Sequence, residues 1–300
     1  MKIATTTAEV LPYVGQNSEQ ATRMYRGTGF HHLDYSFYHA LKIPDHPLMG
    51  EHWKDVINAA KTAAEEEGFS WVQAHLPACK LIGEGKEDGL KACLRAIEAC
   101  GMLGIKLAVI HSSFAEGPYR YPEDKEAYFE ANRPFFKALI PAMEANGVHV
   151  LLENSCEVNT RGLYFPMTAA NLNDFISYLD HPLFGACWDI GHAHIQGLDQ
   201  HDELVALGKN LKAVHIHDNN GAKDQHQPIF NGTLDWDSFM RGIVDSGFEG
   251  PFTYEIDGFL PYRKEPEVLA DFRREKKLQS LTDHYKTAKK LLNAYGIEGE

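Results

Sequence analysis

The sequence lacks the features that mark several large classes of protein. No stretch approaches the roughly 18 consecutive apolar residues of a membrane helix, and the first residues do not form a basic segment followed by a long apolar one. No Gly-x-Gly-x-x-Gly follows the first strand-like segment, so a dinucleotide-binding fold loses its best sequence support. We therefore expect a soluble, unexported protein of the cytoplasm with no membrane partner.

Cysteine is scarce, and its spacing argues against a disulfide framework. The five cysteines are an odd number and include no Cys-x-x-Cys pair. They stand at Cys79, Cys93, Cys100, Cys156 and Cys187. Reduced thiols in a cytoplasmic protein fit this pattern best.

Positive charge is also in short supply, with 29 Lys and Arg against 42 Asp and Glu and a net charge of −13. Broad nucleic-acid-binding surfaces need clustered Lys and Arg, so nucleic acid is not the expected partner. The densest basic stretch, at 273–277, is interleaved with acidic and apolar residues at helical spacing. It predicts a solvated helix face.

Strand-like and helical segments alternate along the 300 residues. The strand candidates lie near 2–6, 31–36, 69–75, 105–111, 148–153, 184–189, 211–217 and 251–256. The helical patterns lie near 17–28, 49–67, 86–102, 122–146, 167–179, 199–209, 235–246 and 266–294. Strict alternation predicts a parallel sheet covered by helices, and eight strands predict a closed (β/α)8 TIM barrel. We expect one domain over 1–300, with the C-terminal helix 266–294 closing the barrel or, alternatively, forming the contact of a homo-oligomer.

Potential metal ligands recur at or just after the C-terminal ends of these strand candidates. They are His75, His111, Glu153, Asp189, His192, His215, Asp224, His226 and Glu255. The C-terminal ends of barrel strands converge on one mouth, so these side chains are expected to meet there. Because an unpaired buried carboxylate is costly, such a ring is expected to hold a cation or to be solvated. The sequence predicts a divalent metal site.

Five segments resemble the signature stretches of the xylose-isomerase-like TIM-barrel superfamily. They lie at 153–155, 187–193, 214–219, 224–228 and 254–255. This superfamily includes sugar isomerases, ketose 3-epimerases, inosose dehydratases and endonuclease-IV-like repair enzymes. The similarity runs from about the third strand to the eighth, and the Asp-Ile-Gly-His and His-x-His-Asp-Asn segments are its most specific parts.

The resemblance implies roles for particular residues. In the sugar epimerase branch, one metal ion is held by four residues that here would be Glu153, Asp189, His215 and Glu255. His192 would help to bind substrate oxygens. In the endonuclease-like branch, three zinc ions also use positions resembling His75, His111, His192, Asp224 and His226. All five of those residue types are present here, so the ligand count does not separate the two branches.

The chemistry of this ligand set indicates a reaction. An oxygen-rich set with one imidazole suits Mn²⁺, Mg²⁺ or Co²⁺, and Zn²⁺ fits if the additional histidines bind. Such an ion would stabilise the enediolate formed when a carbohydrate loses the proton next to its carbonyl. Glu153 and Glu255 are expected to be catalytic, one removing the proton and the other returning it, while His192 polarises a substrate oxygen. A metal-dependent sugar isomerase or epimerase is the first hypothesis.

Other residues admit two interpretations. His75, His111, Asp224 and His226 would bind either a further ion or substrate hydroxyls. Trp71, Trp188 and Phe114 are candidates for stacking on sugar rings, although Trp188 would by default pack into the helix layer. His217 and Asp218 are expected to support the site rather than to form it.

One departure from the family pattern keeps alternatives open. Ketose 3-epimerases of this superfamily place an Arg six residues after the metal-binding His, where this chain has Gly221. Asp224 and His226 are the expected substitutes. The alternatives are a related dehydratase or lyase on a carbohydrate-like substrate, an endonuclease-IV-like zinc phosphodiesterase on abasic DNA, and a barrel that binds carbohydrate or protein without turnover.

Overall fold

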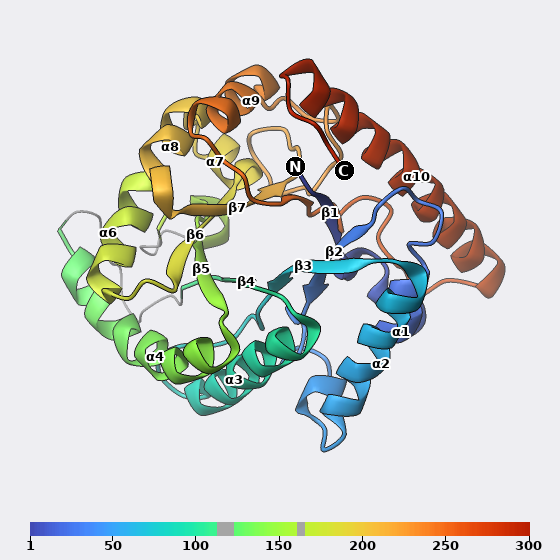
Figure 1. Cartoon of the computed structure of the whole chain (residues 1–300), viewed down its shortest axis with the longest axis horizontal. Helices are drawn as coiled ribbons and strands as arrows, with labels where there is room; N and C mark the ends of the chain where they lie inside the picture. Colours follow the sequence, from blue (N-terminus) through green and yellow to red (C-terminus); the bar gives the residue numbers. More distant parts are fainter. Residues whose placement is uncertain (113–122, 161–165) are drawn as a thin grey trace.

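Eight parallel strands form a closed barrel in the computed structural model, which describes residues 1–112, 123–160 and 166–300 (Figure 1). The strands are β1 (Ile3–Thr6), β2 (His32–Ser36), β3 (Ser70–His75), β4 (Leu107–Ile110), β5 (His149–Glu153), β6 (Phe184–Asp189), β7 (Leu211–Ile216) and β8 (Phe252–Tyr254). Each strand pairs with its neighbours in sequence, and β8 pairs with β1, so the sheet has no free edge. The predicted TIM barrel is confirmed.

Helices surround the barrel at the predicted places. The eight longer or outer ones are α1 (Ser18–Arg23), α2 (Trp53–Glu67), α3 (Lys86–Leu103), α4 (Lys125–Asn146), α6 (Ala169–Leu179), α8 (Gln200–Leu207), α9 (Trp236–Asp245) and α10 (Glu267–Ala294). The sequence did not predict the short helices α5 (Glu157–Thr160) and α7 (Ile190–Ile195), which follow β5 and β6. Single 3-10 turns occur at η1 (Thr7–Glu9), η2 (Leu11–Val14), η3 (Pro47–Met49) and η4 (Gly208–Asn210).

Local signals in the sequence set several helix ends. Thr168 forms a capping box with Asn171 at the start of α6, and the Asp235 side chain accepts hydrogen bonds from the first turn of α9. Gly68 and Gly147 end α2 and α4 with φ of 72° and 60°. Glycine adopts this left-handed conformation at little cost, so each helix stops where the next strand must begin.

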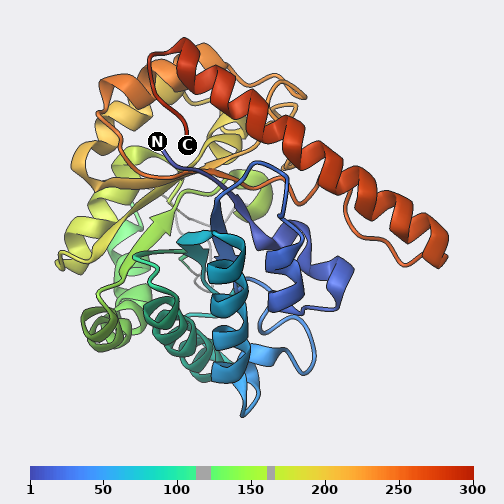
Figure 2. The ribbon, with the colours of Figure 1, turned by 45° about the vertical axis from the view of Figure 1, so that its right-hand side comes forward.

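The C-terminal helix α10 packs along the side of the barrel next to β1 and β8 (Figure 2). The α10 residues Leu281, Ala288 and Leu292 are buried, and the Tyr254 hydroxyl on β8 donates to a backbone carbonyl of α10 at 2.9 Å. The beginning of α10 extends beyond the barrel, and Phe272 there is 61% exposed. None of the described helices combines the length and apolarity needed to cross a bilayer.

A buried ion pair ties α10 to the ends of the first and last strands. Lys277 Nζ lies 2.8 Å from Glu9 Oε2, and both side chains are 0% exposed. The same ammonium donates to the backbone carbonyls of Ile256 and Phe259 at 2.9 and 2.8 Å. The other Glu9 oxygen accepts a hydrogen bond from Thr5. Lys277 therefore holds the segment after β8 against the segment after β1.

Replacing Lys277 by Met should destabilise the protein by about 3–5 kcal/mol, because the Glu9 carboxylate would be left buried without its counter-ion. Urea unfolding of the metal-free protein, followed by circular dichroism, measures this loss. The control is Lys276→Met at the exposed neighbouring position. A second change, Glu9→Gln in the Lys277→Met background, should recover part of the loss. Equal losses for the Lys276 and Lys277 variants would contradict the assignment.

Candidate metal centre

The barrel strands place polar side chains directly above an apolar layer. Val109, Leu151, Cys187 and Ala213 form a buried cluster, separate from the main core, on four neighbouring strands. Two residues further along the same strands stand His111, Glu153, Asp189 and His215. Residues two apart on a strand share a face, so these four continue the inward-facing positions towards the mouth. The apolar layer closes the barrel beneath them.

The residues at the strand ends form three adjoining groups, in each of which one ligand atom per residue lies within 4.8 Å of the others. The first group is Glu153, Asp189, His215 and Glu255; the second is His75, His111 and Glu153; the third is His192, His217, Asp224 and His226. The structure thus brings together all nine residues that the sequence singled out. Glu153 belongs to both the first group and the second.

Glu153 lies at the centre of this arrangement. Its Oε1 is 2.9 Å from His215 Nδ1, and its Oε2 is 3.3 Å from the Nε2 atoms of both His75 and His111. Glu255 Oε2 lies 3.5 Å from the same His215 nitrogen. The Glu153 side chain is 1% exposed. Two imidazole nitrogens therefore converge on one carboxylate oxygen, and two carboxylates converge on one imidazole nitrogen.

Backbone carbonyls fix which nitrogen of each imidazole faces the carboxylates. Nδ1 of His75, His192 and His226 donates to a backbone oxygen at 2.8, 3.0 and 2.8 Å. Their Nε2 atoms are left to face Glu153 or Asp224 at 3.2–3.3 Å. His215 is reversed, because its Nε2 is hydrogen-bonded to the Gln73 amide at 2.8 Å. Fixing one ring nitrogen in this way is typical of metal-binding histidines.

Asp189 orders the third group as well as the first. Its Oδ1 accepts from the backbone N–H of His192 at 2.7 Å, which starts helix α7, and lies 3.0 Å from His217 Nε2. A Cβ atom at Gly191 would lie 1.9 Å from the His217 ring, so only glycine permits this approach. The Asp-Ile-Gly-His segment therefore joins a helix cap, a close contact and two candidate ligands.

His217 has a larger part than the sequence suggested. Its ring stacks on that of His226 with centroids 4.1 Å apart, and it is a member of the third group. The two-residue spacing from His215 was the available signal, since both side chains had to share a face. Asp218, by contrast, orders the loop as predicted, because its carboxylate accepts from the backbone N–H of Leu234 and the indole N–H of Trp236.

The two central glutamates have carboxyl pKa values displaced in opposite directions. Burial raises the pKa of Glu153, but the imidazoles of His111 and His215 outweigh it and hold this pKa well below its usual range. Burial raises the pKa of Glu255 above its usual value, and His215 offsets this only in part. Two neighbouring carboxyl groups whose pKa values are displaced in opposite directions are typical of an acid–base pair. Glu153 remains ionised while Glu255 accepts a proton more readily.

Some buried oxygens of the described residues lack a hydrogen bond that would satisfy them. They include Glu153 Oε2 and Asp224 Oδ1, each facing imidazole nitrogens at 3.3 Å or more without the geometry of a hydrogen bond. His226, which faces Asp224, also holds a strained backbone with φ of 46°. Carboxylate oxygens and oriented imidazole nitrogens that converge in this way fit a divalent metal ion.

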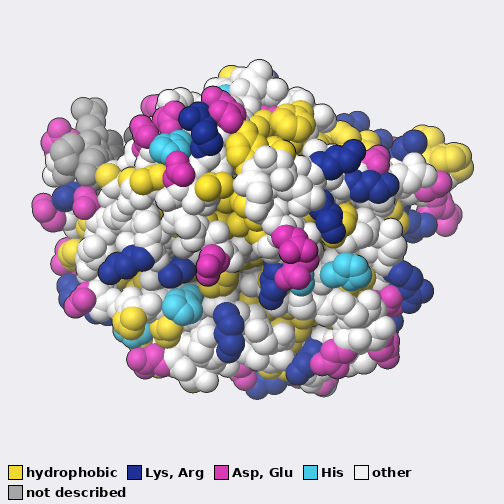
Figure 3. All heavy atoms as spheres, turned by 45° about the horizontal axis from the view of Figure 1, so that its top comes forward, with side chains coloured by type: hydrophobic (Ala, Val, Ile, Leu, Met, Phe, Trp, Pro, Cys, Tyr) yellow, Lys and Arg dark blue, Asp and Glu magenta, His cyan; other side chains and the backbone are white. Residues whose placement is uncertain are grey.

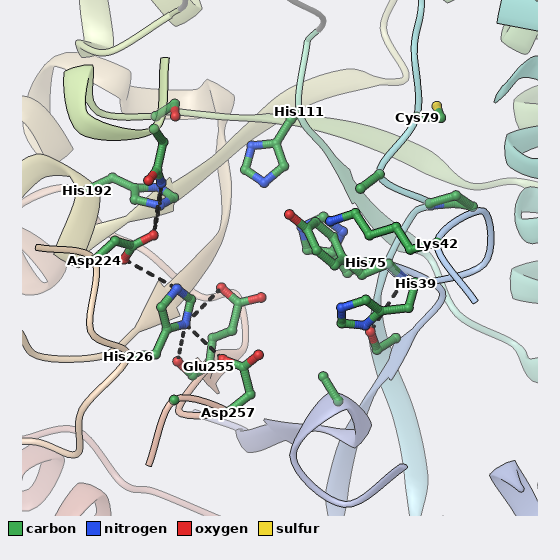
Figure 4. Close-up of a pocket in the computed structure, with 18 of the residues that line it drawn as sticks. His39, Lys42, His75, Cys79, His111, His192, Asp224, His226, Glu255 and Asp257 are labelled. Carbon is green, nitrogen blue, oxygen red and sulfur yellow. Dashed lines mark hydrogen bonds and ion pairs between the residues drawn. The ribbon is translucent and has the colours of Figure 1, made fainter. Parts of the chain in front are cut away.

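The groups open into a cavity of about 980 Å³ (Figure 4). His75, His111, His192 and Glu255 are among its lining residues, while Asp189 and His215 lie beneath its surface. Asn159, which the sequence did not single out, also lines it and donates to Asp224 Oδ2 at 2.8 Å. The cavity is large enough for a small polar substrate above the buried ligands.

The two tryptophans do not stack on this cavity, and that prediction was wrong. Trp188 is 0% exposed and donates its indole N–H to Gln200 of α8 at 2.9 Å, so it faces the helix layer. Trp71 is buried against Tyr35, with ring centroids 5.1 Å apart. Trp188 directly precedes Asp189, and Trp71 precedes His75 by four residues, but neither tryptophan is among the residues that line the cavity. Phe114 lies outside the described residues.

Residues 26–275 match the model of the family described as xylose isomerase-like TIM barrel. The chain belongs to this family. The match covers most of the chain, including all three ligand groups. It confirms the resemblance inferred from the sequence.

The individual proteins to which this chain is similar match it over only part of its length and at low sequence identity. An uncharacterized protein of Sinorhizobium fredii is 28% identical over 177 residues, which are 57% of this chain and 53% of that protein. Fructoselysine 3-epimerase of Escherichia coli O157:H7 is 30% identical over 110 residues, covering 36% of this chain and 39% of the enzyme. The matches therefore span only about half, or less, of these relatives. Sugar epimerases are among the proteins to which this chain is distantly similar.

Solved structures share the whole fold. A D-tagatose 3-epimerase-like protein superposes with a TM-score of 0.69 and 18% identity over 96% of this chain and 98% of the other. A 3-keto-D-glucoside 4-epimerase of E. coli gives 0.66 and 21% identity over 93% and 99%. At this identity the likeness establishes the barrel alone.

Replacing Glu153 by Gln should lower the number of divalent ions retained per chain, because this carboxylate belongs to two of the three groups. Elemental analysis after dialysis measures the number. The control is His201→Gln in the trio Asp199, His201 and Asp202, which has similar ligand types but lies at the surface, with both aspartates exposed and His201 partly exposed. Retention of the full number by the Glu153 variant, or an equal loss in the control, would show that the buried groups do not hold the ions.

Metal binding near neutral pH should release protons. Burial lowers the pKa values of His192 and His215, but neighbouring acidic groups, Asp189 foremost for His192, raise both well above the usual value. The metal-free protein therefore holds protons on these imidazoles, and an ion must displace them, so metal affinity should rise with pH. Calorimetric titration with Mn²⁺ or Zn²⁺ in buffers of different ionisation enthalpy counts the protons. Heats that do not depend on the buffer would contradict the expectation.

Proposed function

We propose that the protein is a metal-dependent sugar isomerase or epimerase that removes the proton next to a substrate carbonyl. The observation that carries this proposal is the pair Glu153 and Glu255, which converge on His215 at the floor of the cavity with pKa values displaced in opposite directions. Similarity to fructoselysine 3-epimerase supports a carbohydrate substrate.

The chain's own residues suggest how the reaction would proceed. Glu255 lines the cavity, and its raised pKa suits a group that takes and holds a proton. Glu153 lies deeper and is ionised, so to return a proton from the opposite side of the substrate it would first take one from solvent. His192 presents Nε2 to the cavity and would donate to a substrate oxygen. A divalent ion bound among these residues would polarise the carbonyl and stabilise the enediolate.

The three groups suit different metals. Glu153, Asp189, His215 and Glu255 form an oxygen-rich set that favours Mn²⁺, Mg²⁺ or Co²⁺. The second and third groups are richer in imidazole and favour Zn²⁺. We propose that the first group holds the ion used in catalysis.

The adjoining second and third groups favour one further candidate, a zinc phosphodiesterase, because several ions close together can clamp a phosphoryl group. A protein described as AP endonuclease, family 2, from Brucella melitensis also superposes with a TM-score of 0.67 at 16% identity. Charge argues against a DNA substrate, since the net charge is −13. On the face seen in Figure 3, acidic and basic side chains are interspersed without a continuous basic stripe.

Incubation with Mn²⁺ or Co²⁺ in D2O should exchange the proton next to the carbonyl of a ketose, detected by NMR. Glu255→Gln should lower the exchange rate by about 10²–10⁴-fold, because the proton acceptor is removed. Glu203→Gln is the matched control, since Glu203 is a partly buried carboxylate of α8 that bonds to the backbone at Ala169. Chelation should abolish exchange, and added metal should restore it.

An abasic duplex assayed in parallel with Zn²⁺ tests the second candidate. Cleavage of the duplex without exchange into any member of a ketose panel would replace the first proposal by the second. Exchange that survives Glu255→Gln would refute the catalytic assignment of this residue.

A further inference from the structure

The cavity has two chemically different sides. Asp224, His226, Glu255 and Asp257 lie on one side, and His39 and Lys42 lie on the other (Figure 4). Lys80 also contributes to the lining. The first side carries candidate ligands, and the candidate ligand His75 lies on the second side with His39 and Lys42. The second has no part in the proposed proton transfer.

Lys42 lies close to the candidate metal ligands. Its Nζ is 3.9 Å from the centroid of the Tyr38 ring, within the range of a cation–π contact. The Tyr38 ring also lies next to the rings of His39, His75 and His111, with centroids 5.1, 5.0 and 6.4 Å away. The ammonium is therefore separated from the second group by about one aromatic ring, and in Figure 4 its side chain extends into the cavity.

The carboxylates of the cavity are engaged elsewhere. Asp224, Glu255 and Asp257 lie 3.3, 3.9 and 3.2 Å from the imidazole of His226. In the described parts of the chain, no carboxylate forms an ion pair with Lys42; the residue is exposed, and partial desolvation of its ammonium lowers its pKa. A cation that is partly desolvated and has no counter-ion is stabilised by an anion that enters beside it.

Charge and position together indicate what this side can bind. The chain as a whole has a net charge of −13, but this side of the cavity carries Lys42, Lys80 and His39 and no carboxylate, so its local charge is positive. Lysine binds phosphate and carboxylate groups as a compact point charge.

We propose that Lys42, with His39 and Lys80, binds an anionic substituent of the substrate, a phosphate or a carboxylate, at the end of the carbohydrate remote from the reacting carbon. This assignment rests on the proposed function. It also narrows that function, because it makes an acidic sugar, rather than a neutral one, the preferred substrate. The substrate would span the cavity from the metal groups to Lys42.

The test compares three ligands of one carbon skeleton with the metal-loaded protein: D-fructose, D-fructose 6-phosphate and D-fructuronate. Calorimetry should show that at least one anionic form binds about tenfold or more tightly than the neutral sugar, as hydrogen bonds to charged groups permit. Lys42→Gln should bring this ratio close to one, and Lys42→Arg should retain most of it. The two anionic ligands distinguish a phosphate subsite from a carboxylate subsite.

Lys61→Gln is the matched control, because it removes one positive charge from an exposed position of α2 outside the cavity. This variant should keep the wild-type ratio. The proposal is overturned if neither anion binds more tightly than D-fructose, or if Lys42→Gln and Lys61→Gln alter the ratio equally.

Proton exchange in D2O, measured on the same three ligands, separates this inference from the proposed function. If binding of an anion depends on Lys42 but no ligand exchanges its proton, the anion subsite is supported and the proposed isomerase activity is contradicted. If D-fructose exchanges its proton but no anion is preferred, the proposed isomerase activity is supported and the anion subsite is contradicted. If both are correct, Lys42→Gln should raise KM for the anionic ketose more than it lowers kcat.

Discussion

A carboxylate that is ionised, 1% exposed and surrounded by imidazoles is the constraint on which the rest of the site depends. Removing a charge from water costs several kcal/mol unless partners compensate it. His75, His111 and His215 provide these partners around Glu153, and the other ring nitrogens of His75 and His215 are in turn held by a backbone carbonyl and by the Gln73 amide. The geometry of the mouth follows from the need to satisfy this one group.

The barrel makes such a cluster possible through the two-residue period of its strands. Val109, Leu151 and Cys187 fill the interior with apolar side chains, and the next inward position on each strand is polar. Strand pairing then places Asp189 and His215 at the same height, whereas Glu153 pairs with Cys187, two residues before Asp189. Residues that are far apart in sequence become neighbours because the sheet closes.

Strand ends and motif spacing were sufficient to predict the barrel and to single out the nine candidate residues, because most of them follow an apolar run and Asp224 and His226 lie in a family-like segment after β7. Features that depend on three-dimensional packing were not predictable. Examples are the hydrogen bond from Trp188 to Gln200 and helix α7, which starts at the Asp189 cap. Lys42 had no motif to mark it, since only the folded chain brings it within one ring of His75.

The ion pair between Glu9 and Lys277 has a consequence for how the chain acquires its structure. Its two members stand near opposite ends of the sequence, so a chain made from the N-terminus exposes the acid long before the base exists. Until then, Glu9 must stay hydrated or bind a proton, and the turn after β1 cannot take its final position. The buried acid beside β1 is therefore paired only after the last helix has been synthesised and has packed against the seam between β1 and β8.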